Sequence, residues 1–279
     1  MEITIKSENK VFNGIQGVYS HQSTTCKCEM TFAVFIPKKD NISKFPFIWY
    51  LSGLTCTHEN AMTKSGAQYW AAQHGVALIF PDTSPRGKDV SDDPSFDLGQ
   101  GAGFYLDAVN EPWKKNFQMW SYINDELPKV VIKNFPVDSK NQAVMGHSMG
   151  GLGALNCAIK NPERFKSVSA LAPICNPVKS EWGQRQFSAY LGDSKEQWES
   201  YDPTILLSQS GFKGQFLIDQ GKNDNFLELL KPESLETVIK NQGLDSIFRY
   251  HEGYDHSYFF VASFIGDHIQ HHSNAFQKK

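Results

Sequence analysis

The sequence predicts an α/β protein with a mainly parallel central sheet, helices on both faces of the sheet and an antiparallel N-terminal edge. Two observations lead to this prediction. Short apolar runs, which suit strands buried on both faces, alternate along the chain with segments of helical composition. Before them, residues 15–37 alternate between polar and apolar and then become apolar, which is typical of strands at an antiparallel sheet edge.

The buried strands are expected where apolar runs meet turn residues. Residues 45–51 are almost wholly apolar and are bounded by Ser52-Gly53, and residues 76–80 form a second run that Pro81 stops. Further strands are expected at 143–145, 168–173, 215–219 and 246–251. Segments of helical composition occupy 61–74, 152–160, 228–242 and 258–269.

Composition limits the kind of protein this can be. A chain of 279 residues with 40% hydrophobic content can bury one large core, so we expect a single domain over residues 1–279. A net charge of -3 leaves no basic excess for nucleic acid. Residues 1–6 lack the apolar stretch of a secretory signal, and no apolar run approaches the ~20 residues that span a membrane.

The cysteines favour a reducing compartment. Five cysteines, an odd number scattered along the chain, argue against a disulfide framework and for the cytoplasm. Cys26 and Cys28 could suggest a metal site, but no second pair of ligands follows at a suitable spacing. We therefore interpret them as strand neighbours and expect neither a metal nor an organic cofactor.

A glycine-flanked serine lies between the strand expected at 143–145 and the helix expected at 152–160. Gly146-His147-Ser148-Met149-Gly150 matches G-x-S-x-G, in which a sharp strand-to-helix turn exposes the serine. Glycine on either side lets neighbouring backbone pass close to the turn. We therefore predict that Ser148 is the nucleophile of an α/β-hydrolase fold. His147 should point away from Ser148, as a packing residue of the turn.

A serine hydroxyl needs a base near neutral pH, and histidine most often has this role. In α/β-hydrolases the nucleophile, the acid and the histidine follow in that order, each after a strand. His256 follows the last expected strand and a short turn, so it is the predicted base. His251 still lies in that strand, and His74 lies in a helical segment. The polar C-terminal tail holds three more, which we expect to be solvated: His268, His271 and His272.

The loop after the strand expected at 215–219 supplies the acid. Asp224 lies within this loop and is the predicted carboxylate that orients His256. Asp219 lies at the strand end, where a structural hydrogen bond to the loop is its expected role. Asp255 adjoins His256 in sequence and cannot easily reach its ring.

Acyl transfer also requires hydrogen-bond donors for the oxyanion of the tetrahedral intermediate. The backbone N–H of Met149, directly after the nucleophile, is one predicted donor. The second is expected from the loop after residues 45–51, where Gly53 allows close approach, and the N–H of Leu54 is our choice. A plain strand-terminating turn is the alternative for this loop.

Several stretches together resemble the S-formylglutathione hydrolase, or esterase D, family. They extend over nearly the whole chain: residues 51–57, 101–105, 146–151, 172–177, 219–224 and 254–259. The resemblance implies a cytoplasmic thioesterase that hydrolyses S-formylglutathione to formate and glutathione in formaldehyde detoxification. Because one methylene usually changes discrimination by only ~1–3 kcal/mol, we also expect side activity on short-chain esters. The family's nucleophile, acid and base match Ser148, Asp224 and His256. A glutathione thioester is thus the expected partner, and a homodimer is left open.

The sequence leaves the roles of three residues near the expected pocket undecided. Cys56 resembles a family cysteine close to the active site, where a thiol reagent could block the acyl pocket, and a small buried residue without a chemical role is the alternative. Trp182 could line the pocket or pack in the core. His58 stands where we expect an acidic residue in the family, which could alter the rim of the pocket.

Two other functions also fit the residues. A general short-chain carboxylesterase would use the same triad on oxygen esters. A catalytically silent binding protein would keep the fold without the reaction, because a fold alone does not determine function. The complete set of nucleophile, acid, base and oxyanion loop argues against the silent protein.

Overall fold

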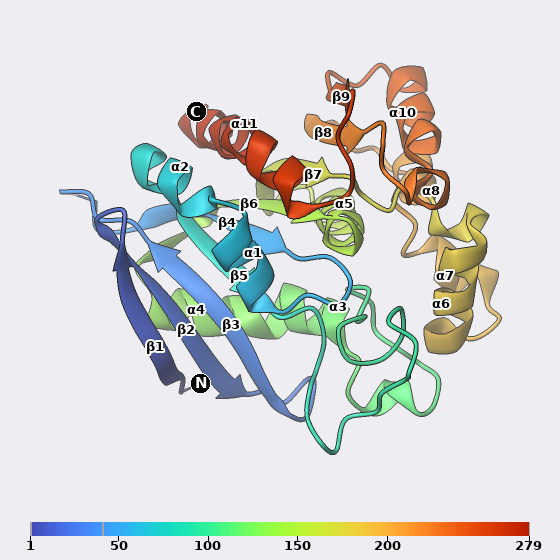
Figure 1. Ribbon diagram of the computed structural model, residues 1–279, viewed down its shortest axis with the longest axis horizontal. Helices are drawn as coiled ribbons and strands as arrows, with labels where there is room; N and C mark the ends of the chain where they lie inside the picture. The colour runs from blue at the N-terminus through green and yellow to red at the C-terminus, as the bar shows by residue number, and fades with distance from the viewer. Residues whose placement is uncertain (1, 41, 279) are drawn as a thin grey trace.

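The computed structural model describes residues 2–40 and 42–278, and a nine-stranded sheet forms the centre of this part of the chain. Its strands are β1 (Thr4–Val11), β2 (Gly14–Gln22), β3 (Glu29–Ile36), β4 (Phe45–Leu51), β5 (Ala77–Pro81), β6 (Val137–His147), β7 (Phe165–Leu171), β8 (Phe216–Gly221) and β9 (Ile247–His251). Across the sheet the order is β1-β2-β3-β5-β4-β6-β7-β8-β9 (Figure 1).

The direction of the strands divides the sheet into two parts. Strands β1, β2 and β3 pair antiparallel, and β3 also pairs antiparallel with β5. From β5 through β4 to β9, every neighbouring pair is parallel. The predicted mainly parallel sheet with an antiparallel N-terminal edge is therefore confirmed. Strand β1 was not among the predicted elements, because its side chains are almost all exposed and show no buried face.

Helices form in each of the four predicted segments, with different ends, and also within residues 119–134 and 181–209, where none was predicted. The α-helices are α1 (His58–Lys64), α2 (Ala67–His74), α3 (Met119–Ser121), α4 (Leu127–Asn134), α5 (Met149–Lys160), α6 (Glu181–Leu191), α7 (Lys195–Glu199), α8 (Pro203–Gln209), α9 (Leu227–Leu230), α10 (Pro232–Asn241) and α11 (Tyr258–Gln277). The segment expected at 61–74 is two helices, because Gly66 adopts a left-handed conformation with φ 72° between them. The segment expected at 228–242 is likewise divided, at Lys231.

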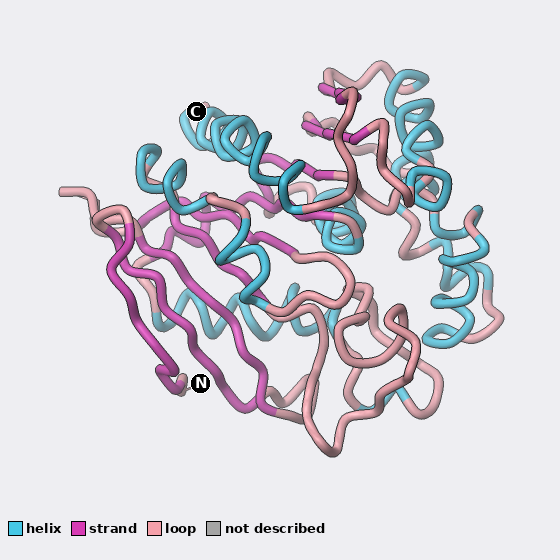
Figure 2. Tube along the Cα trace, in the orientation of Figure 1, coloured by secondary structure: helices cyan, strands magenta, loops and turns pink. Residues whose placement is uncertain are grey.

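Helices cover both faces of the sheet. Helices α2 and α11 pack against each other in front of the strands, while α4 lies behind them in Figure 1. Helix α5 packs against β4, β6 and β7. Figure 2 shows that the chain from β5 to α3 is mostly loop. This long loop, residues 82–118, reaches the same end of the molecule as the loops that follow the parallel strands.

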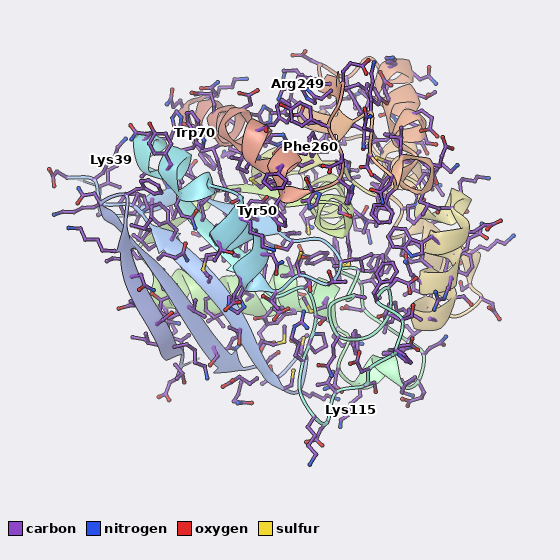
Figure 3. All side chains as sticks on the ribbon, in the orientation of Figure 1. Lys39, Tyr50, Trp70, Lys115, Arg249 and Phe260 are labelled. Atoms are coloured by element: carbon purple, nitrogen blue, oxygen red, sulfur yellow. The ribbon has the colours of Figure 1, made fainter. Side chains whose placement is uncertain are left out.

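A continuous apolar core fills the space between these layers. Trp49, Tyr50 and Phe260 are almost completely buried in it, and Figure 3 shows Tyr50 and Phe260 in the interior. Within residues 2–40 and 42–278, no helix is both long and apolar enough to cross a bilayer.

The prediction of solvated histidines in the C-terminal tail is wrong for two of the three. Helix α11 continues to Gln277 and packs against β6, β7 and β8, so that His268 and His272 are completely buried. His272 lies between the hydroxyl groups of Ser167 and Ser169, at 2.7 and 2.8 Å. A sequence that is polar on average thus still turns one face of its helix into the core.

Candidate active site

The turn between β6 and α5 holds Ser148 in a strained backbone conformation. Its φ of 58° and ψ of -121° lie outside the regions that non-glycine residues usually adopt. A Cβ at Gly146 would lie 2.1 Å from the carbonyl oxygen of Gly150, and one at Gly150 would lie 2.0 Å from that of Leu51. Both glycines are therefore required, as the motif predicts. A strand, a strained serine turn and a helix at the end of a parallel sheet form the nucleophile turn of the α/β-hydrolase fold.

The structure brings His256 and Asp224 together from two loops. Asp224 follows β8 and His256 follows β9, and the parallel pairing of these strands places both loops at one edge of the sheet. The Nδ1 of His256 lies 2.6 Å from Oδ2 of Asp224. Asp224 also accepts hydrogen bonds from the Nε2 of Gln220 at 2.9 Å and the backbone N–H of Phe226 at 2.8 Å. These neutral donors fix the carboxylate in the orientation that faces the imidazole.

Ser148 and His256 line the same cavity, of about 270 Å³. Within the described residues the two side chains form no hydrogen bond with each other. Serine–histidine hydrogen bonds are often loose until substrate binds, so this arrangement is compatible with proton transfer. The other residues that line the cavity are Gly53, Leu54, Thr55, Cys56, Phe96, His147, Trp182 and Phe226.

The loop after β4 approaches the nucleophile closely. A Cβ at Gly53 would lie 3.1 Å from the Cβ of Ser148, so a larger residue would crowd the serine. Thr55 has a φ of 65°, and the loop is held by the guanidinium of Arg86, which donates to the carbonyl of Cys56 at 2.8 Å. In the part of the chain that the structure describes, the backbone N–H groups of Leu54 and Met149 have no protein acceptor. Both are thus available to a ligand in the cavity.

His147 is a buried packing residue of the turn, as predicted, but it also lines the cavity. Its ring was expected to point away from Ser148, but it lines the same cavity and lies beside His256, with 4.7 Å between ring centroids. Burial is the main cause that lowers the pKa of His147 well below its usual value, and the charge of the nearby His256 lowers it further. His147 is therefore a neutral imidazole against the side of His256.

The residues that could compete for the roles of base and acid lie elsewhere. His251 and Asp219 bond to each other at 3.1 Å, and neither lines the cavity. Asp219 has the structural role that we predicted, but its side-chain partners come from β9 and α11 and not from the loop. Asp255 accepts from the backbone N–H and the hydroxyl of Ser257 and has no bond to the ring of His256.

The structure places Cys56 and Trp182 in the cavity lining and His58 outside it. Cys56 lines the cavity, with its Sγ 4.0 Å from the hydroxyl of Tyr258, and burial raises the pKa of its thiol. Trp182 also lines the cavity, and its ring stacks on Phe226 at 5.9 Å and 13°. His58 is buried at the start of α1 and is not among the residues that line the cavity.

The sequence analysis did not predict two of the aromatic residues that line the cavity, Phe96 and Phe226. Phe226 could have been found from its position two residues after Asp224. Phe96 lies in the long loop at 82–118, which has no periodic pattern, so no local signal pointed to it. Among the described residues, no group of three or more histidine, cysteine or acidic side chains is arranged to hold a metal ion.

Comparison with known proteins gives consistent results. The chain matches the Esterase family model over residues 23–271. It is 57% identical to the S-formylglutathione hydrolase of Paracoccus denitrificans (strain Pd 1222), with 96% of each chain covered. It is 49% identical to the S-formylglutathione hydrolase of Mus musculus, again over 96% of each chain. The solved S-formylglutathione hydrolase of Agrobacterium tumefaciens superimposes with a TM-score of 0.94 at 48% identity, covering 98% of this chain and 99% of that one.

Proposed function

This chain belongs to the esterase family, among the S-formylglutathione hydrolases, and from that premise we propose that Ser148, His256 and Asp224 hydrolyse S-formylglutathione to formate and glutathione. The enzyme is thus a serine thioesterase of formaldehyde detoxification, with side activity on short-chain acyl esters. One observation carries the assignment of the triad. The strained Ser148 and His256 line a single cavity, and the Nδ1 of His256 lies 2.6 Å from the buried carboxylate of Asp224.

The first half of the reaction transfers the formyl group to the enzyme. Ser148 Oγ attacks the thioester carbonyl carbon while His256 accepts the hydroxyl proton, and Asp224 stabilises the imidazolium that forms. The N–H groups of Leu54 and Met149 bind the oxyanion of the tetrahedral intermediate. The C–S bond then breaks, glutathione leaves with the proton from His256, and a formyl ester remains on Ser148.

The second half releases formate. A water molecule enters the space left by glutathione and attacks the formyl ester as His256 accepts its proton. The same two N–H groups hold the second oxyanion, and collapse returns the proton to Ser148. Because one histidine serves both steps, its orientation by Asp224 matters twice in each turnover.

The size of the cavity supports a preference for a small acyl group. Its aromatic walls at Phe96, Trp182 and Phe226 limit the space beside Ser148. One additional methylene usually changes discrimination by only ~1–3 kcal/mol, so short acetate esters should still react.

Comparison of two substrates tests the substrate assignment. We expect kcat/KM for S-formylglutathione to exceed that for an aryl acetate by orders of magnitude. A preference for the acetate would instead favour a general short-chain carboxylesterase. A fluorophosphonate should label wild type and not Ser148→Ala, and labelling of Ser148→Ala would contradict the choice of nucleophile.

The thiol of Cys56 gives the cavity a second reactive group. A reagent attached there would occupy the acyl pocket and block activity, and burial should make this reaction slow. Cys56→Ser should therefore resist thiol reagents that inactivate wild type. Equal sensitivity of the two proteins would refute the idea.

Location and assembly are also part of the proposal. All five cysteines are free thiols, which supports a cytoplasmic location, and the continuous core supports one domain over 1–279. The exposed ring of Tyr69 contacts the exposed rings of Phe12 and Trp70. These three rings would suit a homodimer interface, which sedimentation of the purified protein would test.

A further inference from the structure

The proposed substrate and the cavity differ in charge. The glutathione part of S-formylglutathione carries two carboxylates and one ammonium group at neutral pH. The cavity beside Ser148 is lined by apolar, aromatic and neutral polar residues, with no lysine, arginine, aspartate or glutamate among them. Because the thioester must reach Ser148, the charged arms of glutathione must extend over the rim. The groups that recognise them therefore lie outside the cavity.

One wall of the cavity is supported by a buried carboxylate. Asp97 is 1% exposed and accepts a hydrogen bond at 2.8 Å from the indole Nε1 of Trp182, the residue that forms the wall. The Nη1 of Arg185 lies 3.2 Å from the same carboxylate, and the Nε2 of Gln186 lies 3.3 Å from it. Asp97 thereby links the indole of Trp182 to the guanidinium of Arg185.

Arg185 lies beside this wall through its bond to Asp97, and its side chain is partly exposed to solvent. Trp182 and Arg185 are three residues apart in α6, so they lie on the same face of the helix. The side chain of Arg185 is 54% exposed, whereas that of Asp97 is 1% exposed. Its bonds to Asp97 use Nη1, and within the described residues no other hydrogen bond involves this guanidinium. The remaining donors have the planar geometry that matches a carboxylate.

We propose that Arg185 binds a carboxylate of the glutathione moiety and thereby selects glutathione thioesters over neutral esters. This inference rests on the proposed function. Asp97 fixes the guanidinium beside the wall, and its own charge is shared among Trp182, Arg185, Gln186 and Ser95 on the buried side. The exposed edge of the arginine is thus the charge that an approaching anion meets. A local cation is needed here because the whole chain has a net charge of -3.

The test compares a charged and a neutral substrate on one set of variants. The quantity measured is the ratio of kcat/KM for S-formylglutathione to kcat/KM for an aryl acetate. In Arg185→Gln we expect this ratio to fall about tenfold, mainly through a higher KM for S-formylglutathione, as for loss of a partly exposed charged hydrogen bond. Arg185→Lys keeps the charge and should recover part of the ratio. Added salt should lower the wild-type ratio more than that of Arg185→Gln.

Two control variants separate direct binding from other effects. Gln186→Leu removes a neutral donor from Asp97 but keeps the charge of Arg185. Any disturbance of the wall should change kcat/KM for both substrates to the same extent, so the ratio should stay unchanged. Lys166→Gln removes an exposed cation near the start of β7, at the opposite end of the sheet, and should also leave the ratio unchanged.

The possible outcomes are distinct. An unchanged ratio in Arg185→Gln overturns the proposal, and so does an equal fall in Gln186→Leu or Lys166→Gln. Failure of the wild type to hydrolyse S-formylglutathione would instead refute the proposed function. Activity of the wild type on S-formylglutathione with an unchanged ratio in Arg185→Gln leaves that function standing and removes only the role of Arg185.

Discussion

Two aspartates near the end of β8, Asp219 and Asp224, lie in opposite surroundings. Asp219 is completely buried and accepts two hydrogen bonds at 2.6 Å from Arg249, which Figure 3 labels near the upper edge of the molecule. The Nε2 atoms of His251 and His268 each lie 3.1 Å from the same carboxylate. Asp224 meets one imidazole, that of His256, and two neutral donors.

The difference shows what distinguishes a structural carboxylate from one that can serve catalysis. The charge of Asp219 is balanced by a permanent cation, and its oxygens join β8 to β9 and α11. The charge of Asp224 has no such counterion among its hydrogen-bond partners. It can therefore stabilise the positive charge that forms on His256 during the reaction. The number and charge of the donors, and not burial alone, separate the two roles.

Replacing the carboxylate that faces His256 should have the largest effect. Asp224→Asn keeps the shape of the side chain but removes the charge and can hold His256 in the wrong tautomer. We expect kcat to fall by ~10³–10⁴ with little change in thermal stability. Steady-state kinetics and a thermal melt would measure both. Activity near that of wild type would contradict the assignment of Asp224 to the triad and its distinction from Asp219.

Replacing the other carboxylate should affect stability instead. Asp219→Asn leaves Arg249 without its buried partner, and we expect the free energy of unfolding to fall by about 3 kcal/mol, near the lower end for broken buried ion pairs because Arg249 is partly exposed. The folded fraction should keep far more activity than Asp224→Asn. Asp267→Asn removes the exposed partner of Arg249 and should cost under about 1 kcal/mol. Denaturant unfolding of the two variants would test this, and equal losses would contradict it.

The role of Asp219 in stability should also appear, as a smaller effect, in how the stability of the protein depends on pH. Burial raises the pKa of Asp219, but the hydrogen bonds from Arg249, His268 and His251 outweigh burial and hold the pKa well below its ordinary value. The folded protein therefore binds this proton less readily than the unfolded chain. The stabilisation is present above the unfolded pKa of about 3.9 and is lost as the pH falls below it. Below about pH 4, Tm should fall less steeply with falling pH in Asp219→Asn than in wild type.

The chain's local sequence was enough to locate the nucleophile turn. An apolar strand, two glycines at fixed spacing from Ser148 and a following helix are neighbours in sequence. The steric requirement at Gly146 is also local, because a Cβ there would meet the carbonyl of Gly150, whereas a Cβ at Gly150 would meet the distant Leu51. The loops that hold Ser148, Asp224 and His256 could also be predicted to lie close together, because parallel strands bring their following loops to one edge of the sheet.

Only the tertiary structure decided which side chains are covered and which line the cavity. His268 and His272 lie in a polar tail by sequence, but α11 turns them toward β7 and β8. Phe96 reaches the cavity from a loop without periodicity, and His147 lines the cavity with its ring against that of His256. Burial and side-chain contacts depend on distant segments that pack against a residue. Local patterns determine the path of the backbone, and they carry no information about those partners.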